Sequence, residues 1–170
     1  MDYYEEIKNK IIDNETYERV KDYSKERHRV ITYYEIGKLL YEAGGKYGDN
    51  VINEYSKKLV VEVGTKYNER TLRRMRQLYL LFKRQKWSTV STKLSWSHYS
   101  ELLSIKNDDK LSYYLNLSII QNIGVRELRE KIKSKEYERL PDETKNKIIK
   151  EEKLEVKDLV PNSILIKNTN

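Results

Sequence analysis

The chain has 170 residues, of which 38% are hydrophobic and 36% charged, and its formal net charge is +7. It contains no cysteine, which excludes disulfides, thiolate metal sites and cysteine nucleophiles. No apolar run approaches the roughly 20 residues of a membrane-spanning helix, and the acidic first residues lack the apolar core of a signal peptide, so we predict a cytoplasmic protein with no membrane partner.

Helices are predicted along most of the chain, because it holds only six glycines and two prolines and its apolar residues recur at helical spacing. Asp13 or Asn14 is expected to cap the second helix, and Gly44-Gly45 to stop it. Asn68 or Thr65 is expected to cap the fourth. The predicted helices cover about residues 3–12, 14–43, 49–61, 69–85, 97–104, 108–121 and 125–138, and another is expected to begin near residue 141.

Between the fourth and fifth helices, residues 87–97 are rich in serine and threonine, which predicts a loop or a short wing. We predict one helical domain over residues 1–150. Residues 151–170 are interpreted as a linker or tail that leads to a further domain. Fifteen tyrosines against one phenylalanine predict a core whose hydroxyls reach polar partners or the surface.

Positive charge is concentrated between residues 64 and 93. This window holds nine cationic side chains and one acidic side chain, Glu69, so its net charge of +8 exceeds that of the whole chain. The rest of the chain is therefore slightly acidic. Such a local field is typical of proteins that bind a polyanion, most commonly a nucleic-acid backbone.

The fourth predicted helix carries most of this charge and has two faces. At 100° per residue, Leu72, Met75, Tyr79 and Phe82 share one face, while the arginines fall largely on the other. A short helix and a glycine-containing turn precede it. This pattern predicts a mainly α fold with a helix-turn-helix or winged-helix-like core, in which the basic helix enters the major groove of double-stranded DNA.

Arginine and asparagine suit this role, because arginine pairs with guanine, asparagine pairs with adenine, and both arginine and lysine bind phosphate. The residues predicted to reach the groove are Asn68, Arg70, Thr71, Arg73, Arg74 and Gln77. The residues predicted to contact phosphates are Lys66, Arg76, Lys83, Arg84 and Lys86.

A second helix pair repeats the pattern with less charge. Residues 111–121 and 125–133 flank a turn that contains Gly124, and Arg126 and Arg129 are expected to be exposed on the second helix. A plain αα-corner explains the same pattern, and we consider it the better interpretation of this pair.

Other chemistry finds little support in the sequence. No spacing of histidines and carboxylates suits a metal, no glycine-rich loop suits a phosphate, and no nucleophile is paired with a base. We therefore expect no metal, no cofactor and no catalytic activity from this chain alone. The alternative function is a protein interaction or self-association module, including a homodimer, with tyrosines as anchors.

Several segments resemble the N-terminal domain of the YhcG-like proteins. Residues 33–38, Tyr-Tyr-Glu-Ile-Gly-Lys, look like that family's Tyr-Trp-x-Ile-Gly-Arg signature, and residues 68–79 look like its Asn-Leu-x-x-Met-Arg-x-Phe-Tyr motif. Residues 94–98, Leu-Ser-Trp-Ser-His, are similar to its Leu-Pro-Trp-Gly-His motif. Further similarities cover residues 47–59, 113–114 and 124–132, so that the resemblance extends over about residues 15–135.

The resemblance implies a helical, winged-helix-type DNA-binding module that usually precedes a PD-(D/E)XK nuclease domain. A nuclease domain in cis is therefore an expected partner. The sequence departs from the family at Ser95, Ser97 and Gly124-Val125, which affects the second helix pair more than the arginine-rich helix.

Overall fold

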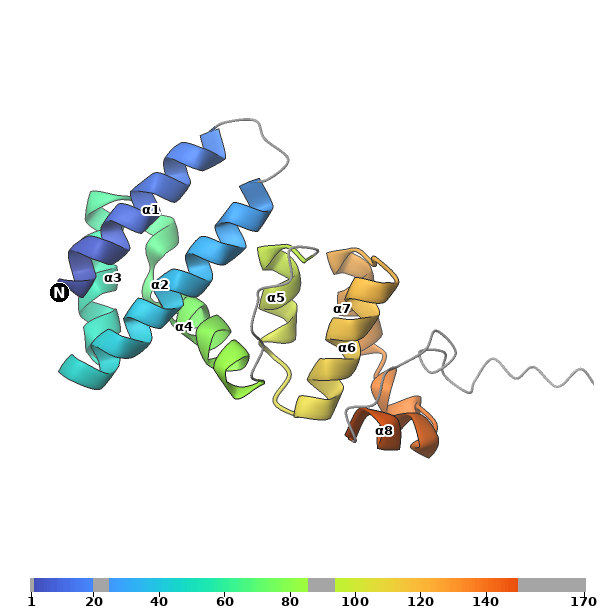
Figure 1. Cartoon of the computed structure of the whole chain (residues 1–170). Helices are drawn as coiled ribbons and strands as arrows, with labels where there is room; N and C mark the ends of the chain where they lie inside the picture. The colour runs from blue at the N-terminus through green and yellow to red at the C-terminus, as the bar shows by residue number, and fades with distance from the viewer. Residues whose placement is uncertain (1, 20–24, 86–93, 150–170) are drawn as a thin grey trace, which may run out of the picture. The chain divides into compact units, whose positions relative to one another are not determined.

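The computed structural model describes residues 2–19, 25–85 and 94–149 (Figure 1). Those residues are mainly helical and contain no strand, which confirms the mainly α class. Most of the predicted wing, residues 87–97, lies outside them, and the winged-helix-like core remains a prediction. No helix in these ranges is long and apolar enough to cross a membrane.

The elements are α1 (Tyr3–Arg19), α2 (Lys25–Tyr47), α3 (Val51–Glu62), η1 (Thr65–Tyr67), α4 (Glu69–Arg84), α5 (Trp96–Leu102), α6 (Asp108–Ile120), α7 (Val125–Lys133), η2 (Tyr137–Arg139) and α8 (Asp142–Ile149).

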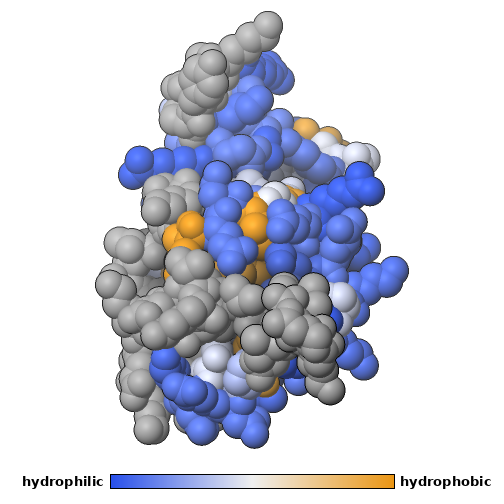
Figure 2. Space-filling view, turned by 90° about the vertical axis from the view of Figure 1, so that its right-hand side faces the viewer, coloured by the Kyte–Doolittle hydropathy of each residue, from blue (hydrophilic) through white to orange (hydrophobic). Residues whose placement is uncertain are grey.

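The chain forms two compact units, residues 1–96 and 97–170, each of which is described by itself. Residues 151–170, the predicted linker or tail, lie outside the described ranges, and the predicted boundary at residue 150 stays a prediction. Figure 2 shows one molecular face, on which hydrophilic residues predominate and hydrophobic ones form small patches. This surface agrees with the high charged fraction of the sequence.

In the N-terminal unit, α2 is the central element. It packs against α4 on one side and α1 on another, and α3 packs against α4 and α2 (Figure 1). The helices bury aliphatic side chains between them, among which Ile36, Leu40, Leu72 and Met75 are inaccessible to solvent. Burying such side chains is the main stabilising contribution that holds the four helices together.

Gly37 allows α2 to approach the backbone of α4. A β-carbon at this position would lie 2.1 Å from the Met75 carbonyl oxygen and 3.1 Å from the Tyr79 Cβ. Only a residue without a side chain fits such a contact. The glycine therefore determines how closely the basic helix is seated on the core.

The first two helices differ from the prediction. Asn14 does not begin a helix, because α1 continues through it to Arg19. Its side chain is fully buried, donates to Glu18 Oε1 at 2.8 Å and lies 3.1 Å from His28 Nδ1. A residue that is typical of a cap is here part of a polar cluster inside the unit.

The end of α2 also lies beyond the predicted stop. Gly44 and Gly45 are both helical, since a glycine inside a helix costs only about 1 kcal/mol. The helix ends at Tyr47, before Gly48, whose φ is +86° and whose N–H donates to the Gly44 carbonyl at 2.9 Å. This left-handed conformation is the usual helix C-terminus and favours glycine.

A polar cluster joins α1, α2 and the turn before α4. Glu18 accepts from Arg29 Nε at 2.6 Å, and Lys66 forms ion pairs with Glu15 and Glu18. The buried Tyr67 hydroxyl donates to Glu15. These contacts attach the turn that begins α4 to the rest of the unit.

Acid is expected to weaken this cluster. Burial alone would raise the pKa of Glu18, but hydrogen bonds from Arg29 and Asn14 and the nearby cations lower it overall. A depressed folded-state pKa contributes stability above the unfolded pKa of about 4.3 that is lost as pH falls through the folded value. The free energy of unfolding, measured with urea from pH 7 to 3, should therefore fall below about pH 4.5. In the Glu18→Gln variant, the free energy of unfolding should decrease less between pH 7 and 3. The same decrease in the variant as in the wild type would contradict this explanation.

The C-terminal unit is built on α6, which packs against α7, η2 and α8. Tyr113 is fully buried, and its hydroxyl donates to Glu136 Oε1 at 2.8 Å. The Tyr114 hydroxyl donates to the Lys131 carbonyl at 3.1 Å and accepts from the Tyr137 N–H at 3.2 Å. Tyr113 and Tyr114 therefore behave as the sequence predicts, whereas the buried Tyr4 hydroxyl has no hydrogen-bond partner among the described residues.

Candidate nucleic-acid interface

The basic helix α4 begins where the sequence predicts. Asn68 is its N-cap, and the Asn68 Oδ1 accepts from the Thr71 N–H at 3.1 Å and from the Thr71 hydroxyl at 3.4 Å. An asparagine in this position satisfies an N–H group that has no partner within the helix. Asn68 and Thr71 are thus hydrogen-bonded to each other, although Asn68 is exposed.

One flank of α4 is buried and the other faces solvent. The buried residues are Leu72, Met75, Leu78, Leu81 and Phe82. Arg70, Arg73 and Gln77 are exposed, and their spacing of three and four residues aligns them along one line of the helix. The predicted separation of an apolar flank from an arginine-rich flank is confirmed.

A surface hollow of about 510 Å³ follows this exposed line. Its lining consists of Glu69, Arg70, Arg73, Arg74 and Gln77. Four of the six residues predicted to reach the groove therefore lie side by side. Neither Arg70 nor Arg74 makes an ion pair within the described ranges, so their guanidinium groups are available to a ligand.

Arg73 differs from these two arginines, because a carboxylate holds it. Its Nε and Nη2 lie 2.7 and 2.6 Å from Glu69 Oε1, one helical turn earlier. The other oxygen, Glu69 Oε2, accepts from Asn53 Nδ2 of α3 at 2.7 Å. The hydrogen bonds from Asn53 and Arg73 hold the pKa of Glu69 below its usual range. No local sequence pattern predicts that Asn53 contributes to this site, because its partner Glu69 lies 16 residues later.

The residues predicted to contact phosphate are less uniform. Lys66 is paired with Glu15 and Glu18, and Arg76 is paired with Asp49 at 2.7 Å while its side chain is only 23% exposed. Lys83 donates to the Tyr41 hydroxyl at 3.0 Å and lies over its ring. Arg84 is exposed near the end of α4, and Lys86 lies outside the described residues.

The helix pair α6–α7 uses its arginines differently. Arg126 is 92% exposed and lies 3.4 Å from Glu130, and Arg129 Nη2 lies 2.6 Å from Glu101 of α5. Both arginines thus have carboxylate partners within the C-terminal unit. This arrangement agrees with the plain αα-corner that the sequence favours for this pair.

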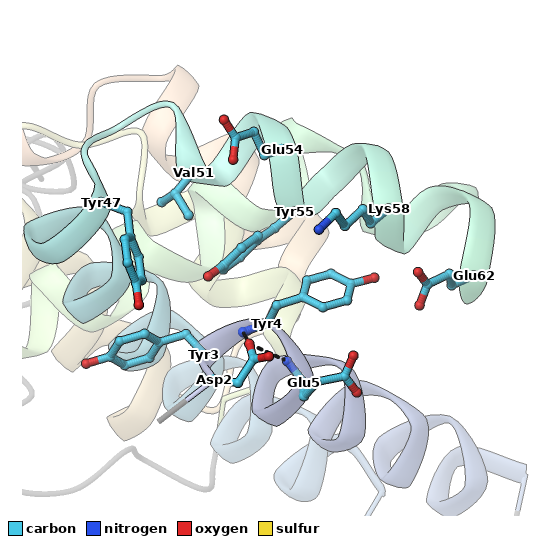
Figure 3. Close-up of a pocket in the computed structure, with 10 residues that line it drawn as sticks. All are labelled: Asp2, Tyr3, Tyr4, Glu5, Tyr47, Val51, Glu54, Tyr55, Lys58 and Glu62. Carbon is cyan, nitrogen blue, oxygen red and sulfur yellow. Dashed lines mark hydrogen bonds between the residues drawn. The ribbon is translucent and has the colours of Figure 1, made fainter.

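A second hollow, of about 770 Å³, lies between the start of α1, the end of α2 and α3 (Figure 3). The rings of Tyr3, Tyr47 and Tyr55 face it, and Tyr47 is 54% exposed. Asp2, which caps α1 through the Tyr4 N–H, contributes to an acidic rim. An aromatic and acidic hollow does not suit a polyanion, so this hollow differs in chemistry from the one on α4.

The described residues contain no group of three or more histidines, cysteines and carboxylates that could hold a metal ion.

Comparison with known proteins shows the family to which the chain belongs. Residues 6–139 match the DUF1016 N-terminal domain. The chain belongs to the DUF1016 N-terminal domain family. A protein named "Putative nuclease YhcG" from Escherichia coli (strain K12) is 30% identical over 64% of this chain. The family match and this relative together confirm the resemblance to the YhcG-like proteins. The chain covers 38% of the length of that relative. No solved structure matches the chain significantly.

Some of the motif residues that carry the resemblance pack in the interior of this structure, whereas others, such as Asn68 and Gln77, are exposed. Tyr33 is buried, with the Trp96 ring edge-on at 5.0 Å, and Gly37 seats α4 on α2. His98 lies 3.0 Å from the Ile123 carbonyl, which precedes the turn into α7. These contacts show how the motif residues hold this structure together, and they do not by themselves indicate DNA binding.

Proposed function

We propose that the N-terminal unit binds double-stranded DNA with α4 in the major groove. The observation that carries the proposal is the exposed line of Arg70, Arg73 and Gln77, with Arg74 beside it, on a helix whose other flank is buried in the core. An α-helix fits the major groove, and arginine is the residue best suited to both guanine and phosphate. The connection of α3 to α4 through a short turn supports a helix-turn-helix placement.

The geometry narrows the set of phosphate contacts. We assign the main phosphate contacts to Arg70 and Arg74, which line the hollow on α4. Arg84 is exposed at the end of the helix but not without a partner, and it would add to them. Lys66 and Arg76 would have to leave carboxylates that already hold them. Lys83 would have to leave the Tyr41 hydroxyl to which it donates. The cap residues of α4 lie near the groove, although their side chains are engaged with each other.

Salt dependence tests the proposal directly. Three to five phosphate contacts predict that the logarithm of the DNA association constant falls against the logarithm of salt concentration with a slope of about −3 to −5. Fluorescence anisotropy with a labelled random-sequence duplex, over roughly 50 to 300 mM NaCl, measures this slope. A flat salt dependence, or no binding at the lowest salt concentration, would end the proposal.

A protein interaction module is the second candidate, and the aromatic hollow of Figure 3 favours it. Tyrosine is a frequent anchor of interfaces, and Tyr47 is the most exposed tyrosine of that hollow. A Tyr47→Ala variant should weaken protein association or self-association without changing DNA affinity. Sedimentation velocity measures the self-association, and the two candidates differ because an aromatic interface depends only weakly on salt.

The role of the whole protein follows as a further part of the proposal. The Escherichia coli relative is named as a nuclease, and this chain matches only a part of it. We propose that the DNA-binding unit delivers a nuclease domain in cis to its substrate, while the unit by itself does not cleave DNA. Incubating the purified chain with plasmid and Mg²⁺ tests this division, since cleavage by the chain alone would contradict it.

A further inference from the structure

The arginines of α4 differ in a way that bears on how the helix would distinguish one base pair from another, an inference that rests on the proposed function. Three arginines line the hollow on α4, but their surroundings are not the same. Arg73 is held by Glu69, whereas Arg70 and Arg74 have no carboxylate partner in the described ranges. The three are therefore not equivalent toward DNA.

The geometry points to Arg73 as a guanine-reading arm that Glu69 and Asn53 position. Both Nε–H and one Nη2–H of Arg73 point to a single oxygen of Glu69, at 2.7 and 2.6 Å. A guanidinium has five N–H groups, so at least one on each terminal nitrogen remains for a ligand. Two such parallel donors match the N7 and O6 acceptors that guanine presents in the major groove.

Asn53 makes this restraint a tertiary one. Its amide, on α3, donates to the second oxygen of Glu69 at 2.7 Å, so the carboxylate is held from both sides. The Glu69 carboxylate therefore cannot rotate freely, and neither can the Arg73 guanidinium that is hydrogen-bonded to it. An arm that is ordered before binding loses less conformational entropy when it meets the base.

The charge of Glu69 also separates the roles of the arginines. A carboxylate next to a phosphate would be repelled, so the Arg73–Glu69 pair suits a base edge better than the DNA backbone. Arg70 and Arg74 are not paired with a carboxylate in this way and suit phosphates. The arrangement thus assigns sequence discrimination to Arg73 and general affinity to the other two.

The test begins with a binding site selected from a randomised duplex library by the wild-type chain. Replacing one guanine of that site by 7-deazaguanine, which lacks the N7 acceptor, should weaken wild-type binding about 10-fold. The Asn53→Ala and Glu69→Ala variants should reduce this penalty to about 3-fold or less, because the arm is no longer held. The affinity of Asn53→Ala for a random duplex should stay within about 3-fold of the wild type, because this variant keeps every charge of the α4 face.

Two controls complete the experiment. Arg73→Lys keeps the charge but removes the paired donors, so it should lose the 7-deazaguanine penalty. Glu130→Ala removes the corresponding partner of Arg126 on α7 and should leave discrimination unchanged. Circular dichroism verifies folding, and if Asn53→Ala is unfolded, Glu69→Ala and Arg73→Lys decide the result.

The outcomes separate the two claims. If the wild type binds no duplex at low salt, the proposed function fails. If it binds without any guanine preference, or if the preference survives in both Glu69→Ala and Arg73→Lys, DNA binding stands and the guanine-reading arm is refuted.

Discussion

A variant with Arg70, Arg73 and Arg74 all replaced by alanine should bind duplex DNA roughly 100- to 1000-fold more weakly than the wild type at low salt. These three side chains line the same hollow on α4, so the variant removes the centre of the proposed interface. The slope of the salt dependence should become shallower by about 2, because Arg70 and Arg74 are the two assigned phosphate contacts and each lost contact releases about 0.9 fewer counterions. Anisotropy titrations over a range of salt concentrations measure both quantities.

Loss of fold is not expected to explain this result. Among the three, Arg73 alone forms an ion pair within the described ranges, and that pair is exposed to solvent and contributes little to stability, while alanine favours the helix. The matched control replaces Lys46, Lys106 and Lys133 by alanine, which removes the same charge from exposed positions outside α4. Equal losses in the two triple variants would show that overall charge, rather than the face of α4, drives binding.

Replacing Gly37 by alanine should destabilise the N-terminal unit by about 3 kcal/mol or more. The added methyl group would lie 2.1 Å from the Met75 carbonyl oxygen and 2.8 Å from its carbon. Both are backbone atoms of α4, so relief requires α2 and α4 to separate, which opens the core of the unit. Urea unfolding monitored by circular dichroism measures the change, and DNA affinity should fall with the folded fraction.

Gly45 provides the matched control for this substitution. It lies in the same helix and is exposed, and a β-carbon added there would have no neighbouring atom within 4 Å. Gly45→Ala should therefore stabilise the protein by about 0.5 to 1 kcal/mol, since alanine is the better helix former. A Gly37→Ala variant as stable as the wild type would contradict the packing of α4 on α2.

The predictions that rest on local signals agree with the structure. The Asn68 cap, the extent of α4 and most of its buried stripe depend on residues within one or two turns of each other, and the sequence predicts them. The exceptions are Tyr79, which is half-buried, and Leu81, which is buried without having been predicted. The predicted boundaries of α1 and α2 are wrong for the opposite reason. Asn14 has the preference of a cap, yet it makes a contact with His28, 14 residues away, which no local pattern reveals.

The candidate site shows the same division. The sequence places the arginines on the exposed side of α4, and Glu69–Arg73 is a helical pair that its four-residue spacing could have suggested. Basic character alone predicts phosphate contacts for Lys66 and Arg76. In the structure, Glu15, 51 residues before Lys66, and Asp49, 27 residues before Arg76, hold these two cations. Partners at such distances come from the folded chain alone.

The sequence by itself determined that this protein is helical, that its positive charge gathers on one amphipathic helix, and that its motifs belong to the DUF1016 N-terminal domain family. Periodicity, capping and charge are properties of neighbouring residues, so they can be read without a fold. Only the tertiary structure decided which of the cations on α4 are paired with carboxylates. It also decided that Asn53 supports Arg73 through Glu69. These features depend on side chains that meet only after α2, α3 and α4 have packed.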